Sequence, residues 1–252
     1  MFILELQGFL YIFARITSFI IAVPGFSHKS VPNTTKVALS LILSWIVYLN
    51  IPAAPVDGNI VLFMLGALRE AIVGISMGFT AKLIFSAIEM AGQHIDFQVG
   101  YSMAAIYDPA SGAVSSYYGK LFYWMSIMVF FLMNLDHTLL QAMMDSFKVL
   151  PPGQISFTNL NLEGILYVFS YSFKIAFSIA APMLIVLLVT DIVMGLISRT
   201  VPEINVFMLG MPLKSMIGMV MFLLLISCFM SNMAGAMGLM NGCMLKIIEM
   251  FH

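Results

Sequence analysis

The sequence predicts an all-α membrane protein, polytopic and built of membrane-associated helical hairpins. Of its 252 residues, 61% are hydrophobic and only 9% are charged, which is far from the composition of soluble domains. Its 11 basic and 12 acidic side chains are too few to give a fold of this size a polar surface. We therefore expect the exterior to face lipid or partner subunits.

Apolar runs in the first half predict helices that approach or exceed the length of a bilayer crossing. A hydrocarbon core about 30 Å thick requires about 20 apolar residues in one helix. The first two runs cover residues 2–23 and 37–47, and prolines follow the second. The third run, residues 60–98, is too long for one perpendicular crossing and contains five charged residues. We expect it to tilt, fold back or leave the membrane.

The second half is divided by two breaks. Residues 100–119 are rich in glycine and serine, and a helical run over residues 120–135 follows them. A polar turn is expected at Asp136 and His137, before the second break at residues 150–153 (LPPG).

The last third predicts a helical hairpin. Its arms cover residues 162–198 and 214–251, and a turn over residues 199–212 joins them. Arg199 and Lys214 bracket this turn, so the excess of basic residues predicts a cytoplasmic location for it.

Six charged side chains lie within the apolar runs, where each would be costly if it faced lipid. One hypothesis is an ion pathway. The alternative is pairing between helices or subunits, or a segment that lies outside the bilayer. We favour the alternative because the charges are dispersed, whereas a proton relay gathers its carboxylates at one depth. The residues are Arg15, Glu70, Glu89, Asp96, Lys174 and Asp191.

One serine lies in a sequence that matches G-x-S-x-G, namely Gly74, Ser76 and Gly78. With His94 or His137 as base, an intramembrane serine protease is conceivable. The nucleophile motif requires a strand, a sharp turn and a helix, whereas these residues continue a helical pattern. We interpret Gly74, Ser76 and Gly78 as a small-residue face for helix packing.

Other function classes find little support in the sequence. A net charge of −1 gives no basic field for nucleic acid, so no nucleic-acid partner is expected. Cys228 and Cys243 lack metal-ligand spacing, and no Walker A or dinucleotide fingerprint is present. We therefore expect no catalytic residue, no metal and no cofactor.

The break after residue 98 differs from an ordinary turn. Residues 98–112 are apolar and small, yet too irregular for a lipid-facing helix. Irregular backbone at membrane depth persists only when it is buried in protein or lines a cavity. The segment is thus a candidate pore gate, with a simple surface loop as the alternative. The candidate residues are Gly100, Tyr107, Asp108, Pro109, Ser111, Gly112, Ser115 and Ser116. Asp108 and Pro109 are expected to anchor it.

Four stretches together resemble the export-gate family of the flagellar biosynthetic protein FliR and its type III secretion relatives. They are residues 24–36 (PGFSHKSVPNTTK), 74–79 (GISMGF), 98–112 and 199–214 (RTVPEINVFMLGMPLK). The resemblance implies a non-enzymatic pore component of flagellum biogenesis, in the bacterial inner membrane at the basal body. Unfolded secreted proteins would pass through the pore.

The same resemblance implies partners and an internal division. The partners are two smaller membrane proteins, called P and Q, in a hetero-oligomer, together with other membrane proteins of the export apparatus. Residues 1–173 would be P-like and residues 174–252 a Q-like helical hairpin, with a plug loop at about residues 100–119. The rival hypothesis is a secondary transporter with an intramembrane charged site, which predicts inverted repeats. No internal repeat is visible.

Overall fold

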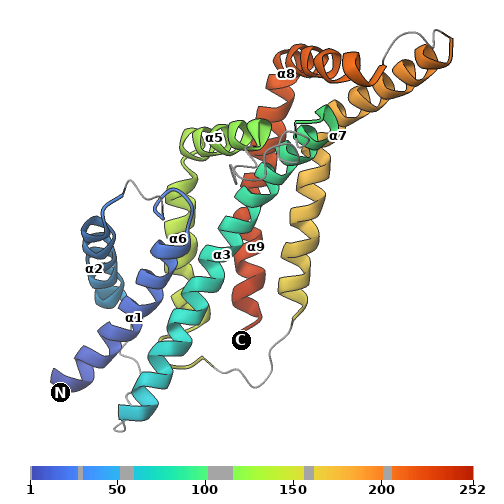
Figure 1. The fold of residues 1–252 in the computed structure, drawn as a ribbon. Helices are drawn as coiled ribbons and strands as arrows, with labels where there is room; N and C mark the ends of the chain where they lie inside the picture. The colour runs from blue at the N-terminus through green and yellow to red at the C-terminus, as the bar shows by residue number, and fades with distance from the viewer. Residues whose placement is uncertain are drawn as a thin grey trace, which may run out of the picture. The chain divides into compact units, whose positions relative to one another are not determined.

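A computed structural model describes residues 2–27, 31–51, 60–101, 116–155, 162–200 and 206–251 (Figure 1). Every regular element in these ranges is a helix, which confirms the all-α fold class. The helices are α1 (Phe2–Ala22), α2 (Asn33–Asn50), α3 (Ile60–Val99), α5 (Tyr117–Leu132), α6 (Leu135–Val149), α7 (Glu163–Thr200), α8 (Val206–Gly238) and α9 (Met240–Glu249).

The chain forms two compact units that interleave along the sequence. Unit 1 comprises Met1–Ile84, Asn134–Ser170 and Gly238–His252, and unit 2 comprises Phe85–Met133 and Tyr171–Met237. Helices α3 and α7 each contribute residues to both units. The expected division into a P-like part and a Q-like part has a single boundary along the sequence, at residues 173 and 174, and it stays a prediction.

Several helices are long and apolar enough to cross a membrane. In the described ranges these are Ile60–Val99, Glu163–Thr200 and Leu209–Glu249, and the pair α5 and α6, bent by 72°, would add a fourth crossing. Helix α3 has 40 residues, so it is roughly 60 Å long at 1.5 Å per residue. It exceeds the thickness of the hydrocarbon core as one unbroken helix. Of the three possibilities for this run, folding back is thus excluded.

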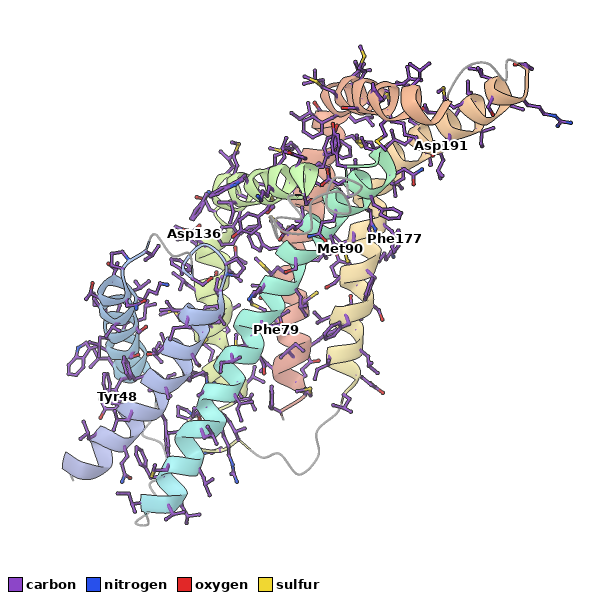
Figure 2. The ribbon with its side chains drawn as sticks, in the orientation of Figure 1. Tyr48, Phe79, Met90, Asp136, Phe177 and Asp191 are labelled. Carbon is purple, nitrogen blue, oxygen red and sulfur yellow. The ribbon has the colours of Figure 1, made fainter. Side chains whose placement is uncertain are left out.

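The break between α5 and α6 lies earlier than expected. Asn134 adopts a left-handed backbone with φ of 52°, a conformation that asparagine tolerates better than most residues. Asp136, which Figure 2 labels, lies in the first turn of α6 and His137 follows it in the same helix, so the polar turn expected there is wrong. An acidic side chain in this position is favourable because the helix N-terminus carries partial positive charge.

The turn between α7 and α8 is shorter than expected. Helix α7 runs to Thr200 and α8 begins at Val206, so Lys214 lies within a helix and the turn expected up to Pro212 is wrong. Both α7 and α8 contain an internal proline, Pro182 and Pro212. Prolines are tolerated in such helices because neighbouring groups satisfy the freed carbonyls. The side of the membrane that Arg199 and Lys214 face stays a prediction.

The core of unit 1 contains a buried ion pair between α1 and α3. Arg15 Nε lies 2.6 Å from Glu70 Oε2, and neither side chain is exposed. Arg15 Nη1 also donates to the Ser146 carbonyl and hydroxyl oxygens of α6, each at 3.3 Å. The guanidinium carbon lies 4.2 Å from the centre of the Phe147 ring. A single side chain therefore joins three helices.

Glu70 extends this network to the break after α6. Its second oxygen, Oε1, accepts a hydrogen bond of 2.8 Å from the backbone N–H of Gly153. The neighbouring Arg69 donates to the Ile155 carbonyl at 3.2 Å. The LPPG break is thus held against α3. Helices α1 and α2 lie side by side in the same unit (Figure 1), where Phe9 contacts the Trp45 ring with centroids 6.2 Å apart.

Replacing Glu70 with alanine is expected to destabilise the protein by about 3–5 kcal/mol, because it leaves the Arg15 charge buried without its partner. The thermal unfolding midpoint of the protein, purified in detergent together with its partner subunits, would measure the loss. Lys148→Ala is the matched control, since its ion pair with Asp145 is exposed and should contribute about 0–1 kcal/mol. The double variant Arg15→Met/Glu70→Leu should be much more stable than Glu70→Ala. Equal midpoints for Glu70→Ala and Lys148→Ala would contradict this assignment.

Candidate functional site at the ends of the gate segment

The segment that the sequence predicts as a pore gate or plug, residues 100–119, is called the gate segment below, and the structure describes its two ends. Gly100, Tyr101 and residues 116–119 belong to unit 2, and residues 117–119 already form the start of α5. The helix therefore begins before the end expected for the segment. The other candidate residues lie outside the described residues: Tyr107, Asp108, Pro109, Ser111, Gly112 and Ser115.

At the first end, α3 stops in a Schellman motif. Gly100 has a φ of +100°, which only glycine adopts without strain. Its N–H bonds the Phe97 carbonyl at 3.2 Å, and the Tyr101 N–H bonds the Asp96 carbonyl at 3.0 Å. These bonds satisfy carbonyls that the end of a helix otherwise leaves without partners. Gly100 thus fixes the point at which the chain leaves α3.

At the second end, the side chain of Asp96 binds the start of α5. Its Oδ1 accepts from the Tyr118 N–H at 3.2 Å, and its Oδ2 accepts from the Gly119 N–H at 3.3 Å. The hydroxyl of Ser116 donates to the same Oδ2. Ser116 is also the N-cap residue, and its Oγ accepts from the Gly119 N–H at 2.9 Å. The first free N–H groups of α5 are thereby satisfied.

Gly92 lets α5 approach α3 closely enough for these bonds. A Cβ atom added at Gly92 would lie 2.4 Å from the Tyr118 carbonyl carbon and 2.5 Å from the Gly119 nitrogen. A Cβ atom at Gly119 would lie 2.1 Å from Ser116 Oγ. A side chain at Gly92 would separate the backbones of α3 and α5, whereas one at Gly119 would displace the Ser116 hydroxyl that caps α5.

A polar junction holds the last turn of α3 to α7 and α8. Lys214 pairs with Asp191, and Lys214 Nζ lies 3.4 Å from the Gln98 carbonyl oxygen. The Gln98 side chain donates to Asp191 Oδ2 at 2.8 Å (Figure 2 labels Asp191 on α7). A lysine near the end of a helix favourably binds carbonyls left without partners. Asp191 was predicted in an apolar run and Lys214 beside a turn, and the structure shows that the two form an ion pair.

Aromatic side chains surround a cavity of about 870 Å³ beside this junction. The Tyr101 hydroxyl lies 2.5 Å from Ser215 Oγ, and its ring contacts the ring of Tyr117 at 5.4 Å between centroids. Tyr118 contacts Phe222 of α8 at 5.8 Å. These residues line the cavity together with Gly100, Leu121, Met211, Pro212, Met219 and Leu223. Both described ends of the gate segment thus border one largely apolar cavity.

Residues 6–240 match the model of the family described as bacterial export proteins, family 1. The chain belongs to this family. It is 34% identical to the flagellar biosynthetic protein FliR of Bacillus subtilis over 227 residues, which cover 87% of this chain and 86% of that protein. It is 27% identical to FliR of Escherichia coli over 206 residues, covering 81% and 78%.

A further relative comes from a secretion system. The chain is 33% identical to the secretion system apparatus protein SsaT of Salmonella typhimurium over 159 residues, covering 63% of this chain and 61% of that protein. The resemblance of this sequence to FliR and its type III secretion relatives is therefore confirmed. All the described contacts at the gate segment lie within the matched residues 6–240 of this family member.

The six intramembrane or interface charges have different surroundings in this family member. Arg15 and Glu70 pair within unit 1, whereas in unit 2 Asp96 caps α5 and Asp191 pairs with Lys214. Glu89 is partly buried on α3, and Lys174 is exposed on α7. Ion pairs between helices account for three of the six, and hydrogen bonds to the start of α5 account for Asp96. Sequence reasoning did not identify Gly92, Gln98 or Ser215, because isolated glycines and amides in apolar helices carry no pattern of their own.

The residues of the imagined protease have ordinary local partners. Ser76 donates to the Ile72 carbonyl of its own helix at 2.8 Å, and His94 stacks on Phe177 with centroids 5.0 Å apart. His137 Nδ1 lies 3.2 Å from Asp136 and its side chain is 80% exposed. Among the described residues, no group of three His, Cys, Asp or Glu side chains is placed to hold a metal ion.

Gly74 and Gly78 lie where α1 contacts α3. A Cβ atom at Gly74 would be 2.1 Å from Ser18 Oγ and 2.2 Å from the Arg15 carbonyl oxygen, and one at Gly78 would be 2.5 Å from the Ala22 Cβ. The helix backbones therefore touch at these positions. Ser76 lies between them and is only partly buried.

Substituting alanine for Gly74 is expected to cost about 1–3 kcal/mol, because the added methyl group meets backbone that cannot move aside. Gly195→Ala in α7 is the matched control, since no atom lies within 4 Å of its added Cβ. That change should stabilise the helix by up to about 1 kcal/mol. The thermal unfolding midpoints of the two variants, each purified together with its partner subunits, would measure the difference in stability. A Gly74→Ala protein as stable as Gly195→Ala would contradict the close approach of α1 and α3.

Proposed function

We propose that this chain is a non-enzymatic membrane component of a bacterial flagellar protein-export apparatus, and that it forms part of the pore through which unfolded proteins cross the inner membrane at the basal body. Family membership over residues 6–240 and relatives named for flagellar biosynthesis and for a secretion apparatus support the export role. Long apolar helices support the membrane location.

One observation carries the proposed role of the gate segment. The backbone carbonyl of Asp96 accepts hydrogen bonds from the residues that follow α3. The carboxylate of the same residue accepts a hydrogen bond from the first turn of α5. The chain thus leaves and rejoins the helical framework at one point. A segment with both ends held can close a passage and yield to a substrate while the helices keep their contacts.

Exposed apolar side chains support the proposed P-like and Q-like partners. Trp45 on α2 is 58% exposed, Ile192 on α7 is 63% exposed and Leu224 on α8 is 71% exposed. Side chains of this kind need lipid or another subunit around them. A pore through which a polypeptide passes also needs walls on every side, which one chain with these few helices cannot supply.

The chain is expected to accumulate in the membrane only when the P-like and Q-like proteins are expressed with it. Affinity purification through this chain should recover both partners, and fractionation should place the complex in the inner membrane. The measurement is the amount of each protein in the purified complex. A chain that is monodisperse and long-lived alone in mild detergent would count against the hetero-oligomer.

Deleting residues 110–115 is expected to make the closed pore leak ions while assembly persists. Ser116 must be kept, because it caps α5 and binds Asp96. Residues 102–109 would remain, and eight residues reach roughly 26 Å when extended, so both ends can stay in place. Membrane conductance of cells or of reconstituted vesicles would report the leak.

The control replaces residues 110–115 with six glycine and serine residues, which keeps the length and changes the composition. If only the deletion variant leaks, the length of the segment is what seals the pore. If the glycine and serine replacement also leaks, the side chains of residues 110–115 are needed for the seal. If the deleted protein assembles and conducts no more than the unaltered one, the gate segment is not the seal.

A further inference from the structure

We infer that Asp96 is the positioning residue of the gate segment: its carboxylate holds the second end of the segment on α3 and sets the register between α3 and α5. This role rests on the proposed function for its consequence, and on described residues of unit 2 for its geometry. Sequence reasoning treated Asp96 as one of several dispersed charges and assigned the anchor to Asp108 and Pro109.

The geometry at Asp96 uses every acceptor that the residue offers. Its backbone carbonyl accepts the N–H groups of Gly100 and Tyr101 at 3.1 and 3.0 Å. Its carboxylate accepts from the backbone of Tyr118 and Gly119 and from the hydroxyl of Ser116. Only 5% of the residue is exposed. The carbonyl bonds would form with any residue at this position, so a substitution of Asp96 acts directly on the start of α5 through the loss of the carboxylate.

The charge of Asp96 is compensated by α5. Among the described side chains, none of the ion pairs formed within 4.0 Å includes Asp96. Its oxygens face N–H groups of the first turn of a helix of 16 residues, where the helix dipole favours negative charge. A side chain without acceptor atoms would leave those buried N–H groups with fewer hydrogen-bond partners.

The close backbone contact at Gly92 is a second, independent support. Gly92 lies one helical turn before Asp96, and its missing side chain lets the Tyr118 carbonyl group approach. Backbone contact and carboxylate bonds therefore fix the same helix start at two successive turns of α3. An N-cap formed by Ser116 alone would satisfy the end of α5 without fixing its position against α3, so these contacts specify more than a helix start.

The nearby junction of Gln98, Asp191 and Lys214 provides a matched comparison. It holds the same last turn of α3, but to α7 and α8. Breaking it should weaken unit 2 without releasing α5 from α3. Glu89 provides a second control, because it is a partly buried carboxylate on the same helix.

The experiment compares Asp96→Ala, Asp96→Asn, Asp191→Ala and Glu89→Ala in the assembled membrane complex. The first readout is an electron paramagnetic resonance distance distribution between spin labels at Phe97 and Met128, which are 72% and 58% exposed on α3 and α5. Asp96→Ala should broaden or shift the distribution. Asp96→Asn, which keeps one carboxamide oxygen, should do so less, and the two controls should leave it unchanged.

The second readout is ion leak per assembled complex. Asp96→Ala should leak more than Asp191→Ala, even when their thermal midpoints are equal. An unchanged distance distribution in Asp96→Ala, or equal leak in Asp191→Ala, would overturn the inference.

The two proposals fail in different ways. If Asp96→Ala alters the distance distribution but neither it nor the deletion of residues 110–115 leaks, Asp96 sets the register and the proposed sealing role is wrong. If the deletion leaks and Asp96→Ala changes neither readout, the seal stands and the positioning role of Asp96 is wrong.

Discussion

Polar groups in an apolar bilayer must find their partners inside the protein, and this constraint shapes both units. Lipid offers neither hydrogen bonds nor counter-charges, so a charged side chain in a long apolar helix is tolerated only where a neighbouring helix satisfies it. Arg15 and Glu70 satisfy each other in unit 1, and Asp191 and Lys214 do so in unit 2. With so few charges available, each pair also determines which helices contact each other.

Close backbone contact accompanies these polar bonds. Gly74 lies against the backbone of Arg15 next to the buried ion pair, and Gly92 lies against the start of α5 next to Asp96. Short hydrogen bonds between helices require the backbones to approach, and glycine is the residue that allows it. The polar side chain and the nearby glycine therefore act together, and neither would be sufficient alone.

The sequence predicted the helical class, the family and most helix positions, because long apolar runs and turn residues are local signals. The polar turn was predicted at Asp136, but the helix has already begun there, and the turn before Lys214 was predicted to be longer than it is. Prolines and charged residues were interpreted as helix ends, although both are accommodated within these helices. The partners of Asp96 and Asp191 could not be predicted. They lie about 20 and more residues away on other helices, and one sequence has no pattern that records such a contact.

The contacts that hold the helices of each unit together would be costly to break. Moving α1 from α3 would separate a fully buried ion pair, and moving α5 from α3 would expose N–H groups that Asp96 satisfies. Each step costs several kcal/mol or leaves polar groups without partners. A passing polypeptide can supply only the weak contacts of an unfolded chain. If the chain forms part of a pore as proposed, we therefore expect both contacts to persist while a polypeptide passes.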